Sequence, residues 1–246
     1  GVRATYSTRA ASWLTLRTGV DAEVVLGQHE RRGSVGLPAR EGDIRAFGQP
    51  PPDSLSSDEY DTSEIGVAPF VEASASFFGD RLEIIPGLRL DTYAYGVSKR
   101  VPAAGNTPAV GAFTQDLTVE PRLAIAVDVM DGLAIRGSIG RYGRIAAGED
   151  RSAQFGNPSL PRARATQGLV TVAVQPIEGL ELEVTGFVAL SSSLAMRSTE
   201  EPAQIAGALV ATGDGRVFGG QAMLRAQLPH GVFGWVSYTL SRAQRR

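Results

Sequence analysis

Hydrophobic and polar residues alternate along most of the chain with a period of two, not with the 3.6-residue period of an amphipathic helix. Within 81–95, one set of alternate positions is mostly apolar: Leu82, Ile84, Pro86, Leu88, Leu90, Thr92 and Ala94. The positions between them are mostly polar: Arg81, Glu83, Ile85, Gly87, Arg89, Asp91, Tyr93 and Tyr95. Because successive side chains of a strand point to opposite faces, the segment predicts a strand with one apolar and one polar face.

The same alternation recurs along the chain and predicts about ten strands and no helix. The predicted strands cover about 2–9, 14–26, 65–78, 81–95, 116–129, 133–142, 165–176, 180–190, 216–228 and 232–242. Several exceed ten residues, whereas strands of globular proteins average about five or six. A tilted strand needs about 9–11 residues to cross a bilayer, so these lengths favour membrane-spanning strands.

Short and long connections alternate between the predicted strands. Short turns are expected at 9–11, 79–80, 130–132, 177–179 and 229–231. Long polar loops are expected at about 28–64, 98–115, 143–164 and 191–215. Such alternation is typical of a barrel with tight turns on one side of the membrane and long loops on the other. The predicted fold is therefore an all-β, antiparallel transmembrane β-barrel segment.

Aromatic residues lie near the predicted strand ends. Those beside the short turns are Trp13, Phe77, Phe78, Phe233 and Trp235. Those towards the long loops are Tyr93, Tyr95 and Tyr142. Amphipathic rings prefer the two membrane–water interfaces, so this arrangement resembles a pair of aromatic girdles.

Composition excludes several classes of protein. No apolar run approaches the roughly 20 residues of a spanning helix, which excludes a helical inner-membrane protein. The net charge of −2 gives no sign of nucleic-acid binding. Cysteine is absent, which excludes disulfides, thiolate metal sites and cysteine nucleophiles, and two histidines are too few for a histidine metal cluster.

Six short segments resemble recurrent strand motifs in the barrel of TonB-dependent outer-membrane receptors. They are Pro-Gly-Leu-Arg-Leu-Asp at 86–91, Glu-Pro-Arg-Leu at 120–123, Gly-Ser-Ile-Gly-Arg-Tyr at 137–142, Gly-Asn-Pro-Ser-Leu at 156–160, Gly-Arg-Val-Phe-Gly-Gly at 215–220 and Gly-Trp-Val-Ser-Tyr-Thr-Leu-Ser at 234–241. Their order and spacing match the family over about 65–246. The chain departs from the family in continuing with Pro161 and Arg162, where Lys-Pro-Glu is frequent, and in having Gln221 where glutamate is usual.

The resemblance implies both an architecture and a function. Family members have about 22 strands around a plugged lumen, so residues 1–246 are expected to be a partial barrel, incomplete at both ends. The full-length protein would lie in the outer membrane of a Gram-negative bacterium, in contact with membrane lipid. It would bind a siderophore-like or other scarce solute and import it with a plug domain and the TonB energy-coupling complex. The resemblance assigns neither the ligand nor the residues that bind it, and implies no cofactor, no metal and no enzyme activity.

Charged residues on the polar face would then face the lumen or the plug. They are Arg81, Glu83, Arg89, Asp91, Glu120, Arg122, Asp128, Arg136, Glu181, Glu183 and Arg225. Their simplest role is to pair with one another across strands on a wall that faces water. The alternative is that some of them contact the plug or the solute.

Three other chemistries are weaker. Asp53, Asp58, Glu59, Asp61 and Glu64 could hold a hard cation but lack calcium-loop spacing, so a solvated loop is the preferred interpretation. Gly137, Gly140 and Gly143 are interpreted as strand glycines because no helix follows them to form a phosphate site. Ser191–Ser193 and His230 are expected at opposite ends of the barrel, too far apart to be nucleophile and base.

Two alternatives to a receptor fragment remain open from the residues. A small passive outer-membrane barrel, or porin-like channel, predicts a chain that ends near Arg246 with an aromatic, but the last residues are Gln244, Arg245 and Arg246. A soluble β-sandwich binding module predicts an apolar face shielded from solvent, and the long apolar strands argue against it.

Overall fold

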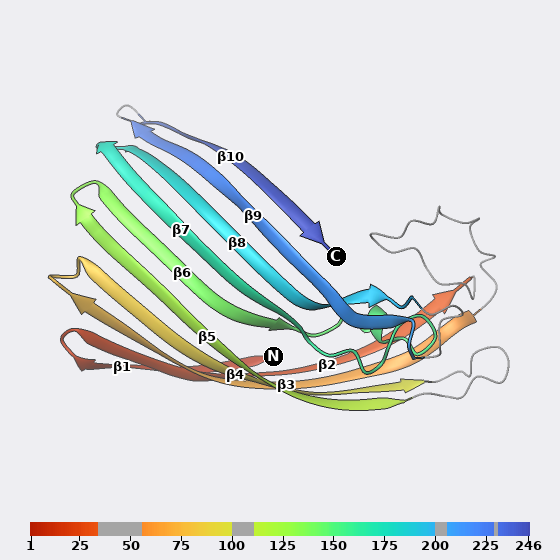
Figure 1. Ribbon diagram of the computed structural model, residues 1–246. Coiled ribbons are helices and arrows are strands. Elements are labelled where there is room, and N and C mark those ends of the chain that lie inside the picture. The colour runs from red at the N-terminus through yellow and green to blue at the C-terminus, as the bar shows by residue number, and fades with distance from the viewer. Residues whose placement is uncertain (34–55, 100–110, 200–205, 229–230) are drawn as a thin grey trace.

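Ten β-strands form one antiparallel sheet in a computed structural model of the chain (Figure 1). The structure describes residues 1–33, 56–99, 111–199, 206–228 and 231–246. The strands are β1 (Val2–Ala11), β2 (Leu14–Arg32), β3 (Ser56–Phe77), β4 (Leu82–Lys99), β5 (Ala112–Met130), β6 (Leu133–Arg144), β7 (Ala163–Ile177), β8 (Leu180–Arg197), β9 (Leu209–Leu228) and β10 (Val232–Arg245). Their order across the sheet is their order in the chain, which confirms the predicted all-β fold of long antiparallel strands.

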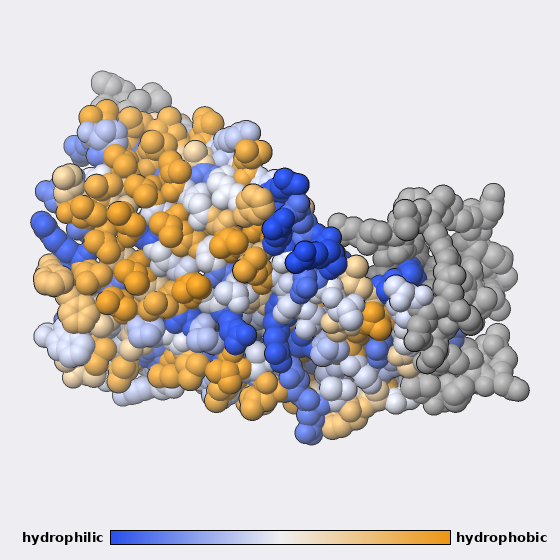
Figure 2. Space-filling view, viewed as in Figure 1, coloured by the Kyte–Doolittle hydropathy of each residue, from blue (hydrophilic) through white to orange (hydrophobic). Residues whose placement is uncertain are grey.

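The strand register explains why the sheet has two unlike faces. Leu90 of β4 pairs with Val119 of β5, and the next pair is Asp91 with Thr118. Leu90 and Val119 are 37% and 49% exposed, whereas Asp91 and Thr118 are 6% and 9% exposed. We call the side of Leu90 and Val119 the apolar face and the opposite side the polar face. Figure 2 shows hydrophobic residues gathered over the half of the sheet nearer the short turns.

The sheet is curved and does not close on itself (Figure 1). Among the residues that the structure describes, β1 pairs only with β2 and β10 only with β9. The short turns lie together at one end of the sheet and the long connections at the other, as predicted. Residues 229 and 230 of the last predicted turn lie outside the described residues, as do 34–55, 100–110 and 200–205 of the long loops.

The strands extend further towards the long connections than the hydrophobic pattern predicts. β2 continues to Arg32 and β3 begins at Ser56, so much of the predicted loop 28–64 is paired backbone. Gln28 pairs with Asp61 and Glu30 with Glu59 in this extension. Both faces of the extension are polar, so the alternation that marks the rest of each strand is absent from its sequence.

The first turn is displaced from its predicted position. Residues 9–11 belong to β1, and the chain reverses at Ser12 and Trp13. Arg9 donates a hydrogen bond from Nη2 to the Ser12 carbonyl oxygen at 2.8 Å, and the Trp13 ring stacks on Phe77 at a centroid distance of 5.9 Å. These contacts stabilise the displaced turn.

The prediction of two aromatic girdles is only partly confirmed. Trp13 and Phe77 form a stacked pair at the short-turn end, as expected. Trp235, however, pairs with Arg225 on the polar face, and so does not lie on the apolar surface. The three tyrosines are also on the polar face, where Tyr93, Tyr95 and Tyr142 each stack against an arginine side chain. The expected girdle at the long-loop end is therefore wrong for these tyrosines.

Helical structure is confined to one short segment in the described part of the chain. The 3-10 helix η1 (Gly148–Arg151) lies within the connection between β6 and β7. Within the described ranges no helix has the length and apolar character required to cross a membrane.

Candidate functional site

The connection between β6 and β7 folds back over the polar face, and many of its residues are buried. We call residues 145–162 the strap. Its side chains Ala153, Phe155 and Leu160 are between 2% and 7% exposed. Buried Tyr95 of β4 donates its hydroxyl to the Leu160 carbonyl oxygen at 2.6 Å, and strap residue Asn157 donates from Nδ2 to the carbonyl oxygen of buried Leu209 in β9 at 3.0 Å. The strap therefore connects strands from both halves of the sheet.

Side chains within the strap fix its local conformation. Ser152 Oγ accepts hydrogen bonds from the amides of Gln154 at 3.1 Å and Phe155 at 2.8 Å, and it donates to Asp58 of β3. At Gly156, a Cβ atom would lie 2.1 Å from the Asp150 carbonyl oxygen, so only glycine fits this turn. The strap is thus a defined structure rather than a solvated loop.

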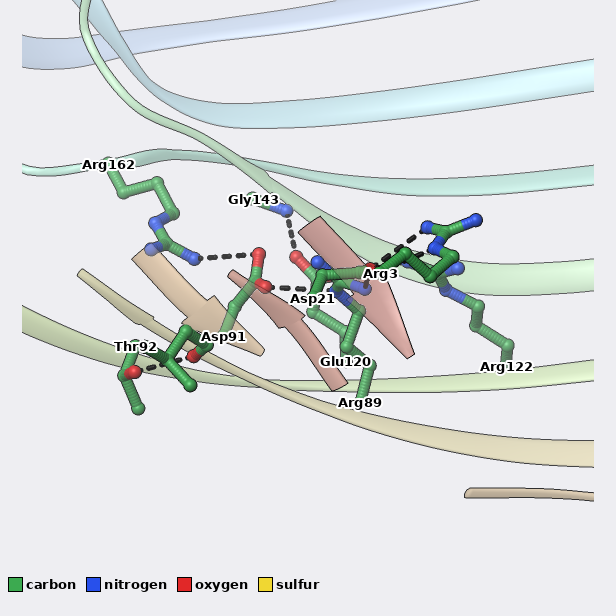
Figure 3. A network of polar contacts seen from close by, with 10 residues as sticks. Arg3, Asp21, Arg89, Asp91, Thr92, Glu120, Arg122, Gly143 and Arg162 are labelled. Atoms are coloured by element: carbon green, nitrogen blue, oxygen red, sulfur yellow. Dashed lines mark hydrogen bonds and ion pairs between the residues drawn. The ribbon is translucent and has the colours of Figure 1, made fainter. Parts of the chain in front are cut away.

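Arg162 anchors the end of the strap. Its side chain is 2% exposed, and Nη1 lies 3.4 Å from Asp91 Oδ2 while Nε lies 3.1 Å from Asp116 Oδ2. Its guanidinium also stacks over the Tyr93 ring at 4.5 Å. Because a buried charge is stable only when it is paired, Asp91 of β4 and Asp116 of β5 allow Arg162 to be buried. Figure 3 shows the pair with Asp91.

A chain of alternating charges continues from this anchor across the polar face (Figure 3). Asp91 accepts from Arg89 Nε at 2.9 Å, and Arg89 in turn pairs with Asp21 of β2. Asp21 also accepts two hydrogen bonds from Arg3 of β1, at 2.5 and 2.9 Å. The charges on four elements of the chain therefore satisfy one another in a single network.

Glu120 forms a second branch beside this network. Its side chain is 3% exposed and accepts from Arg122 Nη2 at 2.9 Å and from the Gly143 amide at 2.5 Å. A Cβ atom at Gly143 would lie 2.3 Å from Arg162 Cδ. The backbone of β6 therefore approaches the anchor closely at this point.

Arg151 anchors the middle of the strap by a different means. Its side chain is 2% exposed and stacks over the Tyr95 ring at 3.8 Å, but its nearest carboxylate oxygen, Glu64 Oε2, is 4.0 Å away. Nε and Nη2 of Arg151 have no hydrogen-bond partner among the described residues, and burial lowers the pKa of this guanidinium. Tyr60 supports the same turn by donating its hydroxyl to the Gly148 carbonyl oxygen at 2.8 Å.

Several predicted lumen charges form ion pairs, but only one of the three pairs below, Arg136 with Glu183, joins two strands; Arg89 with Asp91 and Arg122 with Glu120 are neighbours within β4 and β5. Arg89 meets Asp91, Arg122 meets Glu120, and Arg136 Nη1 lies 3.9 Å from Glu183 Oε1. Arg162, Arg151 and Asp21 were not among the predicted lumen charges. The only sign in the sequence that distinguishes Arg162 is that it stands where the chain departs from the family motif. Asp21 lies on the polar side of a predicted strand, like many other charged residues. Nothing in the sequence distinguishes Arg151.

The remaining candidate groups have other roles. Asp58 lies in β3 and is 5% exposed, so the solvated-loop interpretation is wrong for it, while Asp53 lies outside the described residues. Gly137, Gly140 and Gly143 lie in β6, which confirms that they are strand glycines. Ser191–Ser193 lie in β8 near the long connections, and His230 is outside the described part of the chain.

A comparison with protein families matches residues 3–244 to the model described as TonB dependent receptor-like, beta-barrel. No curated protein sequence matches the chain. Many solved structures do. They include the ferric-catecholate import receptor Fiu of E. coli K12, with a TM-score of 0.67 and 14% identity over 99% of this chain and 37% of that one.

Two further solved structures share the fold. The copper transporter OprC has a TM-score of 0.66 and 17% identity over 98% of this chain and 37% of that one. The siderophore receptor PiuA of Acinetobacter baumannii has a TM-score of 0.64 and 13% identity over 96% of this chain and 37% of that one. The chain thus spans little more than a third of these proteins.

The family match covers almost the whole chain, and the solved structures share its curved sheet of antiparallel strands. The family is one of receptors, and the solved structures above are receptors and a transporter, not enzymes. The motifs, the two-faced sheet and the family match lead to one conclusion: the chain belongs to the TonB-dependent receptor family, as part of its β-barrel.

Proposed function

We propose that the chain is part of the wall of an outer-membrane receptor of a Gram-negative bacterium, which imports a scarce solute with energy from the TonB complex. The family match over residues 3–244 carries this proposal. The two-faced sheet supports it, because the apolar face suits lipid and the charged face suits a wet, plugged lumen.

In this proposal, residues 1–246 are a partial barrel that further strands complete at both ends. The open edges of β1 and β10 favour this arrangement, since unpaired strand edges are not stable inside a bilayer. The solved relatives are more than twice as long as this chain, which leaves room for those strands and for a plug domain. The charge network of Arg3, Asp21, Arg89 and Asp91 would then line the plug cavity.

The long connections and the strap are the proposed place of solute recognition, because binding residues concentrate on loops held by a rigid scaffold. The structural relatives are described as receptors for a ferric catecholate and a siderophore and as a copper transporter. The solute of this receptor is proposed to be of the same kind, a siderophore-like iron complex or another scarce nutrient.

The test uses the full-length receptor in cells from which its gene has been deleted. Radiolabelled iron on a catecholate siderophore and labelled copper are supplied separately, in cells with and without functional TonB. We expect uptake of one probe to require both the receptor and TonB, and the receptor to fractionate with the outer membrane. Uptake that is unchanged without TonB would indicate a passive channel and refute the energised mechanism.

A further inference from the structure

The apolar face of β6–β10 carries exposed arginines at its long-connection end. Strand register places Arg141, Thr166, Leu190, Arg216 and Gln244 in one row across the five strands. The next row towards the short turns is Ile139, Gly168, Val188, Phe218 and Arg242. Arg141, Arg216 and Arg242 therefore share a face with exposed apolar side chains, and all three are exposed. Figure 2 shows hydrophilic residues bordering the apolar area on this side.

In the part of the chain that the structure describes, these arginines have no acidic partner, unlike the arginines of the charge network on the polar face. Arg3, Arg89, Arg122 and Arg162 each pair with a carboxylate. Within the described ranges Arg141 and Arg242 make no ion pair, and Arg216 donates to the uncharged Gln244 at 2.5 Å.

The surrounding charge is also uneven. Asp214, one row beyond Arg216, is the acid nearest to this cluster along β9. The same face of β2 and β3 instead carries Glu30, Glu59 and Asp61 at its long-connection end. Arg32 of β2 pairs with Glu30 at 2.8 Å, so among the described residues the arginines of the apolar face without an acidic partner lie in its β6–β10 half.

An apolar groove adjoins the arginines. It has a volume of about 760 Å³, and its walls include Leu123, Ile139, Val170, Val188 and Phe218. Gly186 forms part of its lining, and a Cβ atom there would meet no atom within 4 Å. Ile139, Val188 and Phe218 lie in the row next to Arg141 and Arg216, so charge and groove are continuous.

We propose that this surface binds a phosphorylated lipid of the outer leaflet, with its phosphates on the three arginines and an acyl chain in the groove. The inference rests on the proposed function, which puts the apolar face in lipid and the long connections outside the cell. Guanidinium groups bind phosphate oxygens in a bidentate manner, and arginines close to a membrane surface attract anionic headgroups. The groove's apolar walls match a hydrocarbon chain, whereas a water-soluble anion would leave them exposed.

The first test compares lipid binding to the full-length receptor in detergent by native mass spectrometry. The probes are diphosphoryl lipid A, the same lipid after phosphatase treatment, and phosphatidylcholine. The variant carries Arg141→Gln, Arg216→Gln and Arg242→Gln, and the control carries Arg17→Gln, Arg81→Gln and Arg136→Gln, which are exposed arginines away from the apolar face. If each arginine contributes about fivefold to the affinity for an anionic headgroup, the variant should lose about 100-fold in affinity for the phosphorylated lipid. The affinity of the control should stay within about threefold of that of the unmodified receptor.

The second test fills the groove without disturbing the charges. Gly186→Leu adds a side chain where there is open space, and Gly234→Leu is the matched control, because a Cβ atom there also meets nothing within 4 Å and the residue is not part of the groove. We expect Gly186→Leu to weaken retention of diphosphoryl lipid A about tenfold and Gly234→Leu to leave it unchanged. Equal effects of the two substitutions would show that the groove takes no acyl chain.

Three outcomes would overturn the inference: equal retention of the phosphorylated and phosphatase-treated lipids, no loss in the triple variant, or displacement of the lipid by millimolar inorganic phosphate. The last outcome would indicate a site for a free anion. Failure of the inference is distinguishable from failure of the proposed function, because outer-membrane fractionation and TonB-dependent uptake are measured in the same cells. A receptor that imports its solute without any lipid selectivity refutes only the lipid site.

Discussion

Replacement of Arg162 by methionine is expected to release the strap from the polar face. Methionine is also long and unbranched, but it removes the guanidinium that stacks on Tyr93 and pairs with Asp91 and Asp116. Loss of one partner of a buried ion pair costs about 3–5 kcal/mol. We expect less here, about 2–3 kcal/mol, because Asp91 keeps Arg89 as a partner and Asp116 is 28% exposed.

Hydrogen exchange followed by mass spectrometry measures this opening in the full-length receptor. The amides of Gly156, Asn157 and Leu160 are hydrogen-bonded within the strap, at 2.9, 2.9 and 3.2 Å. If exchange follows local opening, a loss of about 2–3 kcal/mol accelerates it roughly 30- to 150-fold. Arg162→Lys should give an exchange rate between those of the unmodified receptor and Arg162→Met, since an ammonium retains the charge but not the planar fork of the guanidinium.

The matched control is Arg136→Met, because this arginine is 57% exposed and its carboxylate partner is 3.9 Å away. An exposed pair of this kind contributes at most about 1 kcal/mol, so exchange in the strap should be unchanged. The reasoning is refuted if Arg162→Met leaves strap exchange within twofold of the unmodified receptor. It is also refuted if exchange rises equally in β8 and β9, since that would indicate general unfolding.

Three further predictions concern the strap and the isolated sheet. Tyr95→Phe removes the hydrogen bond to the Leu160 carbonyl oxygen, and a loss of about 1 kcal/mol should accelerate strap exchange roughly fivefold; an unchanged rate would mean that this bond does not hold the strap. Gly156→Ala places Cβ against the Asp150 carbonyl oxygen and should expose the strap to trypsin, which limited proteolysis would detect as new cleavage in 145–162. The chain expressed alone in detergent-free buffer should aggregate, because its apolar face and both sheet edges are exposed; a monodisperse species in size-exclusion chromatography would contradict this.

The alternation of side chains made most of the sheet predictable. Leu117 and Glu120 were assigned to opposite sides of one predicted strand, and they are 60% and 2% exposed on the two faces. The alternation carries this information because successive side chains of a strand point to opposite faces, and the two faces have different surroundings. It ceased to be informative beyond Leu26, where both faces of the strand are polar.

The strap could not be predicted from sequence because long-range contacts define it. Arg162 looks like any loop arginine until Asp91 and Asp116, 71 and 46 positions away in the chain, are brought beside it. Tyr95 was assigned to a membrane interface because tyrosine commonly occurs there, whereas burial under Arg151 gives it a different role. Residue type indicates a preference for an environment, but only the tertiary fold determines which environment the residue receives.

Strict pairing of each strand with its neighbour in sequence has a consequence for how the sheet is assembled. Every ladder from β1 to β10 joins segments separated by a single connection, so no strand has to search for a partner far along the chain. The entropy of closing each connection grows slowly with its length, so even the long connections add little to the cost of forming the next ladder. The wall can therefore grow hairpin by hairpin in the order of synthesis, and only the seam that finally joins the first and last strands of the complete barrel requires a contact between distant parts of the chain.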